Sequence, residues 1–263
     1  GYAIKLAQEI NGEIISVDSM QVYKGLDIGT AKITYEEMKQ IPHHLLDVIY
    51  PDTDYSVADF QKDARMKIAE IIARGKTPIL VGGTGLYIQS VVYDYQFDAF
   101  DAIDYTRYEG LTLTMLSERL EKIDYDSFLN IDKQNRRRIT HALALAEQTD
   151  KSKSEREKAQ EQKLIYDIFA IALMPERSKL YENINKRVAM MINQGLIAEV
   201  EFFQKKYKLA PQVQKAIGYK ETLDFLNGAI ETKDELIETI SQDTRRFAKR
   251  QCTWIRNQRI NYR

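Results

Sequence analysis

Two short apolar segments separated by one long amphipathic segment constrain this chain more than any other feature. Residues 13–17 and 79–81 are mainly apolar and have the length of buried strands. Between them, residues 57–72 carry apolar side chains at helical spacing, and Ser56 precedes them as a helix-capping residue. A strand, a long crossover helix and a second strand form a βαβ unit, whose two strands are parallel. The sequence therefore predicts an α/β fold with a parallel sheet.

Polar residues and glycines follow both predicted strands. Asp18 comes directly after the first strand, and Gly82-Gly83-Thr84-Gly85 comes after the second. Because ligands of open α/β sheets bind at the carboxyl ends of the strands, Asp18 is a candidate general base or metal ligand. An aspartate that caps a turn is an equally good alternative. The glycines would let backbone N–H groups approach a phosphate beside the Thr84 hydroxyl, although a tight turn also explains them.

The composition is that of an ordinary globular protein. Hydrophobic residues make up 44% of the chain and charged residues 29%, which excludes collagen-like and wholly disordered proteins. No run of 18 apolar residues occurs, so we expect no membrane span. The single cysteine, Cys252, excludes a disulfide scaffold and is typical of a cytoplasmic protein. Because the net charge is −1, any nucleic-acid surface must be a local patch.

Beyond residue 93 the strand pattern gives way to a helical one. An irregular stretch rich in Asp and Tyr comes first, and most of the chain from Leu111 onward has helical periodicity. One apolar stripe at helical spacing consists of Leu180, Ile184, Val188 and Met191. These patterns predict an α/β half followed by a mainly helical half.

Positive charge gathers near the C-terminal end. The last twenty residues contain no acidic residue and seven basic ones: Arg245, Arg246, Lys249, Arg250, Arg256, Arg259 and Arg263. Phe247, Trp254 and Tyr262 are interleaved with them, and Arg137 and Arg138 form a second basic cluster. Basic residues with interleaved aromatics suit contact with phosphates and stacking on bases. A solvated helix with an apolar core stripe is the simpler alternative for this feature alone.

Two further pairs of residues could bind ligands. His43 and His44 are adjacent, so on an extended segment they point to opposite sides, and we expect a structural role rather than a shared metal ion. Arg177 and Arg187 bracket a predicted helix, and arginine pairs with diphosphate oxygens through two hydrogen bonds. A plain surface arginine is the more common case.

Nine segments of the chain occur in the order in which one known family has them. They are residues 15–23 (ISVDSMQVY), 25–32 (GLDIGTAK), 42–47 (PHHLLD), 56–60 (SVADF), 81–87 (VGGTGLY), 135–138 (NRRR), 185–188 (NKRV), 214–220 (QKAIGYK) and 249–254 (KRQCTW). In this combination the chain resembles the tRNA dimethylallyltransferases, also called tRNA isopentenyltransferases. The resemblance covers most of the chain, and matches in this order are highly specific.

The resemblance implies a P-loop-kinase-like α/β core with an inserted, tRNA-binding helical domain. On this pattern we expect the α/β core over residues 1–92, the inserted helical domain over 93–150, and a return to the core with a helical, basic C-terminal part over 151–263. In the family a phosphate loop lies just before the helix predicted near residues 2–10, so we expect that loop among residues preceding Gly1; no Walker motif occurs in the chain itself. The implied reaction moves a dimethylallyl group from dimethylallyl diphosphate to N6 of the adenine 3′ of the anticodon, in tRNAs reading codons that start with U. Mg²⁺ on the diphosphate is the expected cofactor, with its protein ligands left open.

Site residues follow by matching motif positions. The resemblance makes Asp18 the candidate base, Thr84 and Arg187 candidates to stabilise the leaving diphosphate, and Gly83 and Arg177 further diphosphate contacts. The candidate tRNA contacts are Asp18, Ser19, Gln21, Tyr23, Arg137, Arg138, His141, Lys215, Gly218, Tyr219, Lys220, Lys249, Arg250 and Trp254. Gln21 carries both donors and acceptors for an adenine edge. Family members often have arginine at the position of His141, so we expect a weaker or pH-dependent contact there.

Two other functions stay open at this point. A small-molecule P-loop kinase, or an isopentenyltransferase acting on free adenine nucleotides, would share the α/β half, but the helical half and the basic stretch argue against it. A non-catalytic RNA-binding module would follow if the protein lacked a phosphate loop altogether. The expected partners are tRNA and dimethylallyl diphosphate, with no membrane association and no obligate protein partner.

Overall fold

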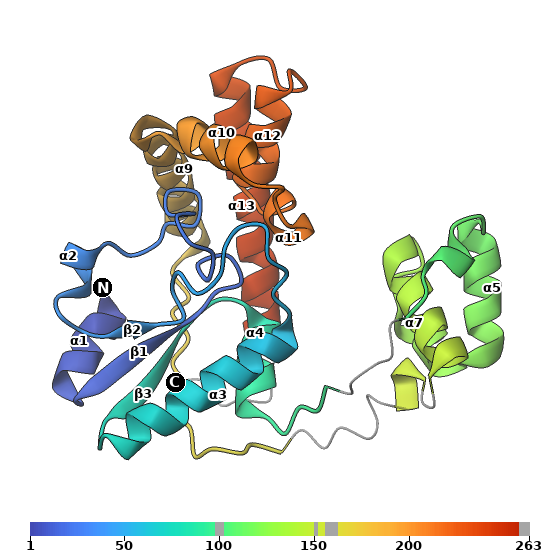
Figure 1. Cartoon of the computed structure of the whole chain (residues 1–263), viewed down its shortest axis with the longest axis horizontal. Helices are drawn as coiled ribbons and strands as arrows, with labels where there is room; N and C mark the ends of the chain where they lie inside the picture. The colour runs from blue at the N-terminus through green and yellow to red at the C-terminus, as the bar shows by residue number, and fades with distance from the viewer. Residues whose placement is uncertain (98–102, 150–151, 156–162, 258–263) are drawn as a thin grey trace. The chain divides into compact units, whose positions relative to one another are not determined.

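Three parallel strands form the sheet of the core (Figure 1). The computed structural model describes residues 1–97, 103–149, 152–155 and 163–257. Strand β1 (Gly12–Val17) lies between β2 (His43–His44) and β3 (Thr77–Gly82). All residues of β1 are buried, as expected for a central strand covered on both faces. The predicted parallel α/β fold is confirmed, with β2 as a strand that the sequence pattern did not predict.

Helices cover both faces of this sheet. The crossover helix α3 (Val57–Ala73) starts with a capping box, in which the Ser56 and Asp59 side chains each accept the backbone amide of the other residue. Neighbouring residues of β1 point to opposite faces, so Ile15 packs with α3 and Ile14 packs with α1 (Tyr2–Glu9). Helix α4 (Gly85–Val92) follows β3 directly after the glycine turn. A short helix, α2 (Tyr35–Met38), precedes β2.

The second part of the same compact unit is helical. It contains α9 (Arg177–Gln194), α10 (Leu196–Lys206), α11 (Pro211–Gln214), α12 (Tyr219–Leu226) and α13 (Lys233–Arg256). Gly195, with φ of 106°, ends α9 and starts α10. The long helix α13 packs against α9, α12 and α4, so it extends from the helical part down to the sheet (Figure 1). Throughout the described ranges, no helix is both long and apolar enough to cross a bilayer.

Residues 93–165 form a second compact unit with a hydrophobic core of its own. Its elements are the 3-10 helix η1 (Thr106–Tyr108), α5 (Leu113–Ile123), α6 (Tyr125–Asn130) and α7 (Arg136–Gln148). Residues 1–92 and 166–263 make up the first unit, so the chain returns to it after residue 165, not at 151. The reason is an antiparallel bridge between Tyr93 and Leu164, which pairs the entering and leaving segments of the second unit.

Candidate active site

The carboxyl ends of β1 and β3 bring two predicted site segments together. Val17 and Gly82 are partners in the sheet, so Asp18 and Gly83 follow neighbouring strand ends. The Thr84 amide donates to the Val17 carbonyl at 3.4 Å, which holds the glycine turn against the end of β1. A β-carbon on Gly82 would collide with the Val17 backbone, so only glycine fits there. Asp18 and Thr84 therefore share the edge at which α/β sheets bind ligands.

Asp18 caps the turn after β1 with one of its oxygens. Oδ1 accepts hydrogen bonds from the backbone amides of Met20 at 2.8 Å and Gln21 at 3.2 Å. Among the described residues, none donates a hydrogen bond to Oδ2. The protein around Arg187 lowers the pKa of its guanidinium, and the negative charge of Asp18 acts in the opposite direction. Arg187 is exposed and stays charged at neutral pH, so Asp18 has one available oxygen and a cation near it.

Helix α13 covers the glycine turn. Gln251 Nε2 donates to the Gly83 carbonyl at 3.0 Å, and a β-carbon on Gly83 would collide with this carboxamide. The Trp254 indole packs so closely against Gly85 that no side chain fits there. We predicted that a diphosphate approaches Gly83 closely. In the structure the Gln251 carboxamide lies there. Trp254 is half-buried against Gly85, because its position three residues after Gln251 places it on the same face of α13. Its contact with tRNA stays a prediction.

Thr84 and Arg187 keep all their side-chain polar groups available, whereas Arg177 shares one of its own with Tyr181. In the part of the chain that the structure describes, no residue hydrogen-bonds to the Thr84 hydroxyl or the Arg187 guanidinium. Arg177 Nε donates to the Tyr181 hydroxyl at 3.1 Å, and its guanidinium lies 5.1 Å from the centre of that ring. Arg177 also precedes Arg187 by ten residues of α9, roughly 15 Å along the axis. The two side chains therefore start from well-separated points on the helix, and the contact of Arg177 with the same diphosphate stays a prediction.

Gln21 is held at both ends of its carboxamide. Ser16 Oγ donates to Oε1 at 3.0 Å, and Nε2 donates to the Thr30 carbonyl at 3.2 Å. One N–H and one acceptor lone pair of the amide remain for a ligand. Ser19, also predicted to meet the target base, is half-buried in the same segment.

Tyr23 belongs to the loop formed by residues 18–32, and its side chain is part of the hydrophobic core. It is 1% exposed, and its hydroxyl has no hydrogen-bond partner among the described residues. Burial and the charge of Asp54 raise its pKa to about 12. The buried Lys32 ammonium spans the same loop, donating to the Tyr23 carbonyl at 2.8 Å and to the carboxylates of Asp27 and Asp47 at 2.7 Å each. The predicted contact of Tyr23 with RNA is therefore wrong, because its side chain belongs to the core.

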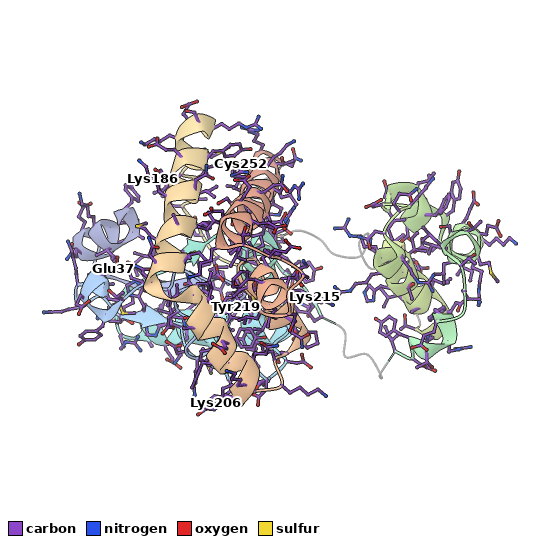
Figure 2. The ribbon with its side chains drawn as sticks, turned by 90° about the horizontal axis from the view of Figure 1, so that it is seen from above. Glu37, Lys186, Lys206, Lys215, Tyr219 and Cys252 are labelled. Atoms are coloured by element: carbon purple, nitrogen blue, oxygen red, sulfur yellow. The ribbon has the colours of Figure 1, made fainter. Side chains whose placement is uncertain are left out.

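Gly218 and Tyr219, two more predicted tRNA contacts, are also buried. The Tyr219 hydroxyl donates to Glu199 at 2.7 Å, and its ring lies against Gly29. Burial raises the pKa of Tyr219, and the charge of Glu199 raises it further. Gly218 has φ of 90° and precedes the first residue of α12. Figure 2 shows Tyr219 among the helices and Lys215 at the edge of the unit, so Gly218 and Tyr219 build the protein and do not face RNA.

Four of the predicted tRNA contacts of this unit are exposed cations: Lys215, Lys220, Lys249 and Arg250. Lys220 forms an ion pair with Asp224 at 2.8 Å, and the Arg250 guanidinium lies 5.6 Å from the centre of the Phe247 ring. These positions are available to a polyanion. Arg259, Tyr262 and Arg263, which we included in the basic C-terminal stretch, lie outside the described residues.

The second unit carries a basic cluster of its own at the start of α7. Arg137 and Arg138 are exposed, and the Asn135 side chain caps the helix by accepting the Arg138 amide at 3.2 Å. His141 Nδ1 lies 2.8 Å from the Tyr105 hydroxyl, and the two rings stack. The surrounding protein lowers the pKa of His141, and the positive charges of nearby cations lower it further. His141 is therefore neutral at pH 7 and gains charge only in acid.

A second acid occupies the opposite edge of the sheet. Glu13, near the start of β1, is 3% exposed and lies 2.7 Å from His44, 2.7 Å from Arg74 and 2.8 Å from Lys76. Burial raises the pKa of Glu13, but hydrogen bonds from Lys76, His44 and Arg74 outweigh it and lower the pKa to about 2. The charge is compensated inside the fold, so we assign this cluster, His44 included, to stability.

Few protein groups are placed to hold a metal ion. Over the described residues, no group of three or more His, Cys, Asp or Glu side chains has a metal-binding arrangement. Mg²⁺ needs few protein ligands when a diphosphate supplies oxygens. The free oxygen of Asp18 and the Thr84 hydroxyl are ligands of the kind that fits such an ion.

Three residues that shape this edge escaped the sequence analysis. Gln251 had a usable signal, since its spacing to Trp254 places both on one helix face. Ser16 also had one, because it is a polar residue inside an apolar strand. Glu199 had none, because the backbone amides that it accepts lie about 170 residues away in the chain.

Known proteins match this chain along most of its length. The family model described as IPP transferase matches residues 21–258. A tRNA dimethylallyltransferase of Anoxybacillus flavithermus is 50% identical over 258 residues, covering 97% of this chain and 83% of the relative.

Solved structures match as well. A tRNA isopentenylpyrophosphate transferase from Staphylococcus epidermidis is 40% identical, with a TM-score of 0.70 over 99% of this chain and 86% of that one. A eukaryotic dimethylallyltransferase acting on tRNA is 30% identical, with a TM-score of 0.82 over 96% of this chain and 65% of that one. With its sheet, its site edge and these matches in agreement, the chain belongs to the IPP transferase family.

Proposed function

We propose that this protein transfers a dimethylallyl group from dimethylallyl diphosphate to N6 of the adenine immediately 3′ of the anticodon, in tRNAs reading codons that start with U. The observation that carries the proposal is the edge where Asp18, with one available oxygen, lies beside Thr84 and near Arg187. Membership of the IPP transferase family and 50% identity to a tRNA dimethylallyltransferase support it.

Asp18 is the group we propose as general base. The exocyclic amine of adenine is a poor nucleophile, because its lone pair is delocalised into the ring. As N6 bonds to the first carbon of the dimethylallyl group, that carbon's bond to oxygen breaks, diphosphate leaves with the electron pair, and the proton on N6 passes to Asp18 Oδ2. Because Oδ1 stays bonded to the Met20 and Gln21 amides, Oδ2 is held in place during the transfer.

The leaving diphosphate gains negative charge as its bond to carbon breaks. Arg187 and the Thr84 hydroxyl are the groups of this chain that we propose to stabilise it, because neither hydrogen-bonds to another described residue. Mg²⁺, when bound to the diphosphate, would neutralise part of that charge, with the Thr84 hydroxyl as a suitable oxygen ligand.

The RNA contacts we propose are the exposed cations. Lys215, Lys249 and Arg250 of the first unit, and Arg137 and Arg138 of the second, can each neutralise a phosphate. The target adenine must leave its stack to reach Asp18, which costs a few kcal/mol and least in a loop. We propose the cytoplasm, where tRNA is present, as the place of this activity.

A transfer assay tests the proposal. The protein is incubated with Mg²⁺, labelled dimethylallyl diphosphate and an anticodon stem-loop with adenine at the target position. A guanine-substituted loop is the control. Label on the adenine loop alone is the expected result. Label on free adenine nucleotide but on neither loop would replace the proposal with a small-molecule enzyme, and binding without any transfer would replace it with an RNA-binding module.

A further inference from the structure

The carboxylate of Glu199 accepts four hydrogen bonds, three of them from the loop formed by residues 18–32. Three successive backbone amides donate to it, those of Asp27 at 3.0 Å, Ile28 at 2.8 Å and Gly29 at 3.1 Å. The Tyr219 hydroxyl donates to the same carboxylate at 2.7 Å. Glu199 is on α10 and Tyr219 is on α12, so one side chain fixes the loop to two helices of the core.

This clamp reaches Gln21 through one residue. Gly29, held by Glu199, precedes Thr30, whose carbonyl accepts from Gln21 Nε2 at 3.2 Å. The Thr30 hydroxyl donates to the Leu26 carbonyl at 2.6 Å, which keeps the Thr30 backbone in the same loop turn. A carbonyl only accepts, so it requires the nitrogen end of the Gln21 amide to face it.

Ser16 fixes the other end of the same amide. Its hydroxyl, on the buried central strand β1, donates to Gln21 Oε1 at 3.0 Å. The carboxamide is thus held from the strand on one side and from the clamped loop on the other. In this orientation it presents one acceptor and one donor to a ligand. Turning it over would place Oε1 against the Thr30 carbonyl, an acceptor facing an acceptor, while Ser16 holds the amide in position against the strand.

An adenine edge offers a donor at N6 next to an acceptor at N7, and a glutamine amide pairs with both. A guanine edge offers two acceptors, O6 and N7, so a fixed Oε1 would face O6 without a proton between them. A mobile amide could turn its NH₂ group toward O6, but a fixed one cannot. We propose that Ser16 and Glu199 are positioning residues that hold Gln21 in the orientation selective for adenine over guanine. This inference rests on the proposed function, because it takes the tRNA adenine as the ligand.

The test measures base preference in binding, a quantity that general loss of stability does not change. Dissociation constants are measured by fluorescence anisotropy for two anticodon stem-loops, with adenine or guanine at the target position. Ser16→Ala removes one contact of the amide, and Glu199→Gln puts an NH₂ group against backbone N–H donors. We expect each to lower the adenine-over-guanine preference roughly tenfold, as for the loss of one specific base contact.

Two matched variants serve as controls. Ser16→Thr keeps the hydroxyl. Glu201→Gln makes the same chemical change as Glu199→Gln on the same helix, where the partner of Glu201 among the described residues is the exposed Lys205. Both should keep the preference of the unchanged protein. If Glu199→Gln fails to fold, Ser16→Ala against Ser16→Thr still decides the question.

The outcomes separate this inference from the proposed function. An unchanged protein that modifies and prefers adenine, together with Ser16→Ala and Glu199→Gln variants that keep the preference, would overturn the inference alone. An unchanged protein that binds both loops equally and modifies neither would overturn both. A preference that falls in the two variants and returns with Ser16→Thr would support the inference.

Discussion

Strand β1 carries an acid at each end, and the two acids are treated in opposite ways. Glu13 near its start is enclosed by His44, Arg74 and Lys76 at 2.7–2.8 Å. Asp18 just past its end holds two backbone amides with one oxygen, and no described residue donates a hydrogen bond to the other. Glu13 lies in this central strand and Asp18 directly follows it, so the groups that surround each acid make the difference.

The comparison indicates that the edge at the start of β1 contributes to stability, whereas the edge at its end carries the candidate active site. A buried carboxylate that is paired with Arg74, Lys76 and a histidine has no capacity left for a ligand, and its ion pairs make the fold more stable above its pKa. A carboxylate with one free oxygen, near an arginine without a hydrogen-bond partner among the described residues, has that capacity. Each prediction below tests this contrast or extends it.

The largest effect is expected for Asp18→Asn. The asparagine oxygen can still accept the Met20 and Gln21 amides, so the turn stays folded, but the side chain can no longer take a proton from adenine. We expect the single-turnover rate of dimethylallyl transfer to fall about 10²-fold or more. Affinity for the anticodon stem-loop should change little. A variant that transfers at the original rate would remove Asp18 from the role of base.

Glu13→Gln should act on stability instead. The folded-state pKa of Glu13, about 2, lies below its ordinary value of 4.5, a difference equivalent to roughly 3 kcal/mol. Because Arg74 and Lys76 are partly exposed, we expect a smaller loss, about 2 kcal/mol in the free energy of unfolding by urea at pH 7.

The pH dependence of this loss has a definite sign. The contribution of Glu13 is complete above about pH 4.5 and disappears as the pH falls toward 2, because the pKa is lowered on folding. The difference in unfolding free energy between the unchanged protein and Glu13→Gln should therefore narrow over that range. A difference that stays constant down to pH 2 would show that the ionised carboxylate is not its source.

A smaller effect is expected for the double variant Lys249→Ala with Arg250→Ala. Both side chains are exposed on α13, and we expect each to neutralise one phosphate. Stem-loop affinity at 100 mM salt should fall about tenfold, with a shallower salt dependence, while binding of inorganic diphosphate should not change. Lys179→Ala with Lys205→Ala, two exposed lysines already paired with glutamates, is the matched control. Equal losses in both double variants would indicate a general charge effect.

The smallest effect is expected at His141 in the second unit. Its pKa lies below the ordinary value of 6.5, so at pH 7.5 the ring is neutral. His141→Arg should strengthen stem-loop binding about threefold at that pH by adding one cation. The gain should shrink as the pH falls below the lowered pKa of His141, where the histidine itself becomes charged. A pH-independent gain would mean that protonation of His141 makes no contribution to RNA binding.

The sequence predicted the backbone of the core well but its side-chain contacts less well. The βαβ unit, the Ser56 cap and the glycine turn follow from local patterns, which is why they were found. Strand β2 has two residues and no pattern of its own; its pairing with β1 creates it.

The candidate site shows the same limit. Asp18 and Thr84 could be predicted, because strand ends and glycine turns mark the ligand edge of an α/β sheet. The burial of Tyr23 and Tyr219 could not, because a tyrosine in a polar motif looks the same whether it faces RNA or the core. The covering of Gly83 by Gln251 depends on residues 168 positions apart, which no local pattern records.

The contrast between the two acids of β1 is tested most directly by one paired measurement. The single-turnover transfer rate and the urea unfolding free energy are determined for Asp18→Asn and Glu13→Gln, under the same conditions. We predict a crossed result: Asp18→Asn loses the rate and keeps its stability, whereas Glu13→Gln loses stability and, at temperatures where it is folded, keeps the rate. Two variants that lose rate and stability in the same proportion would contradict the division between a chemical and a structural edge.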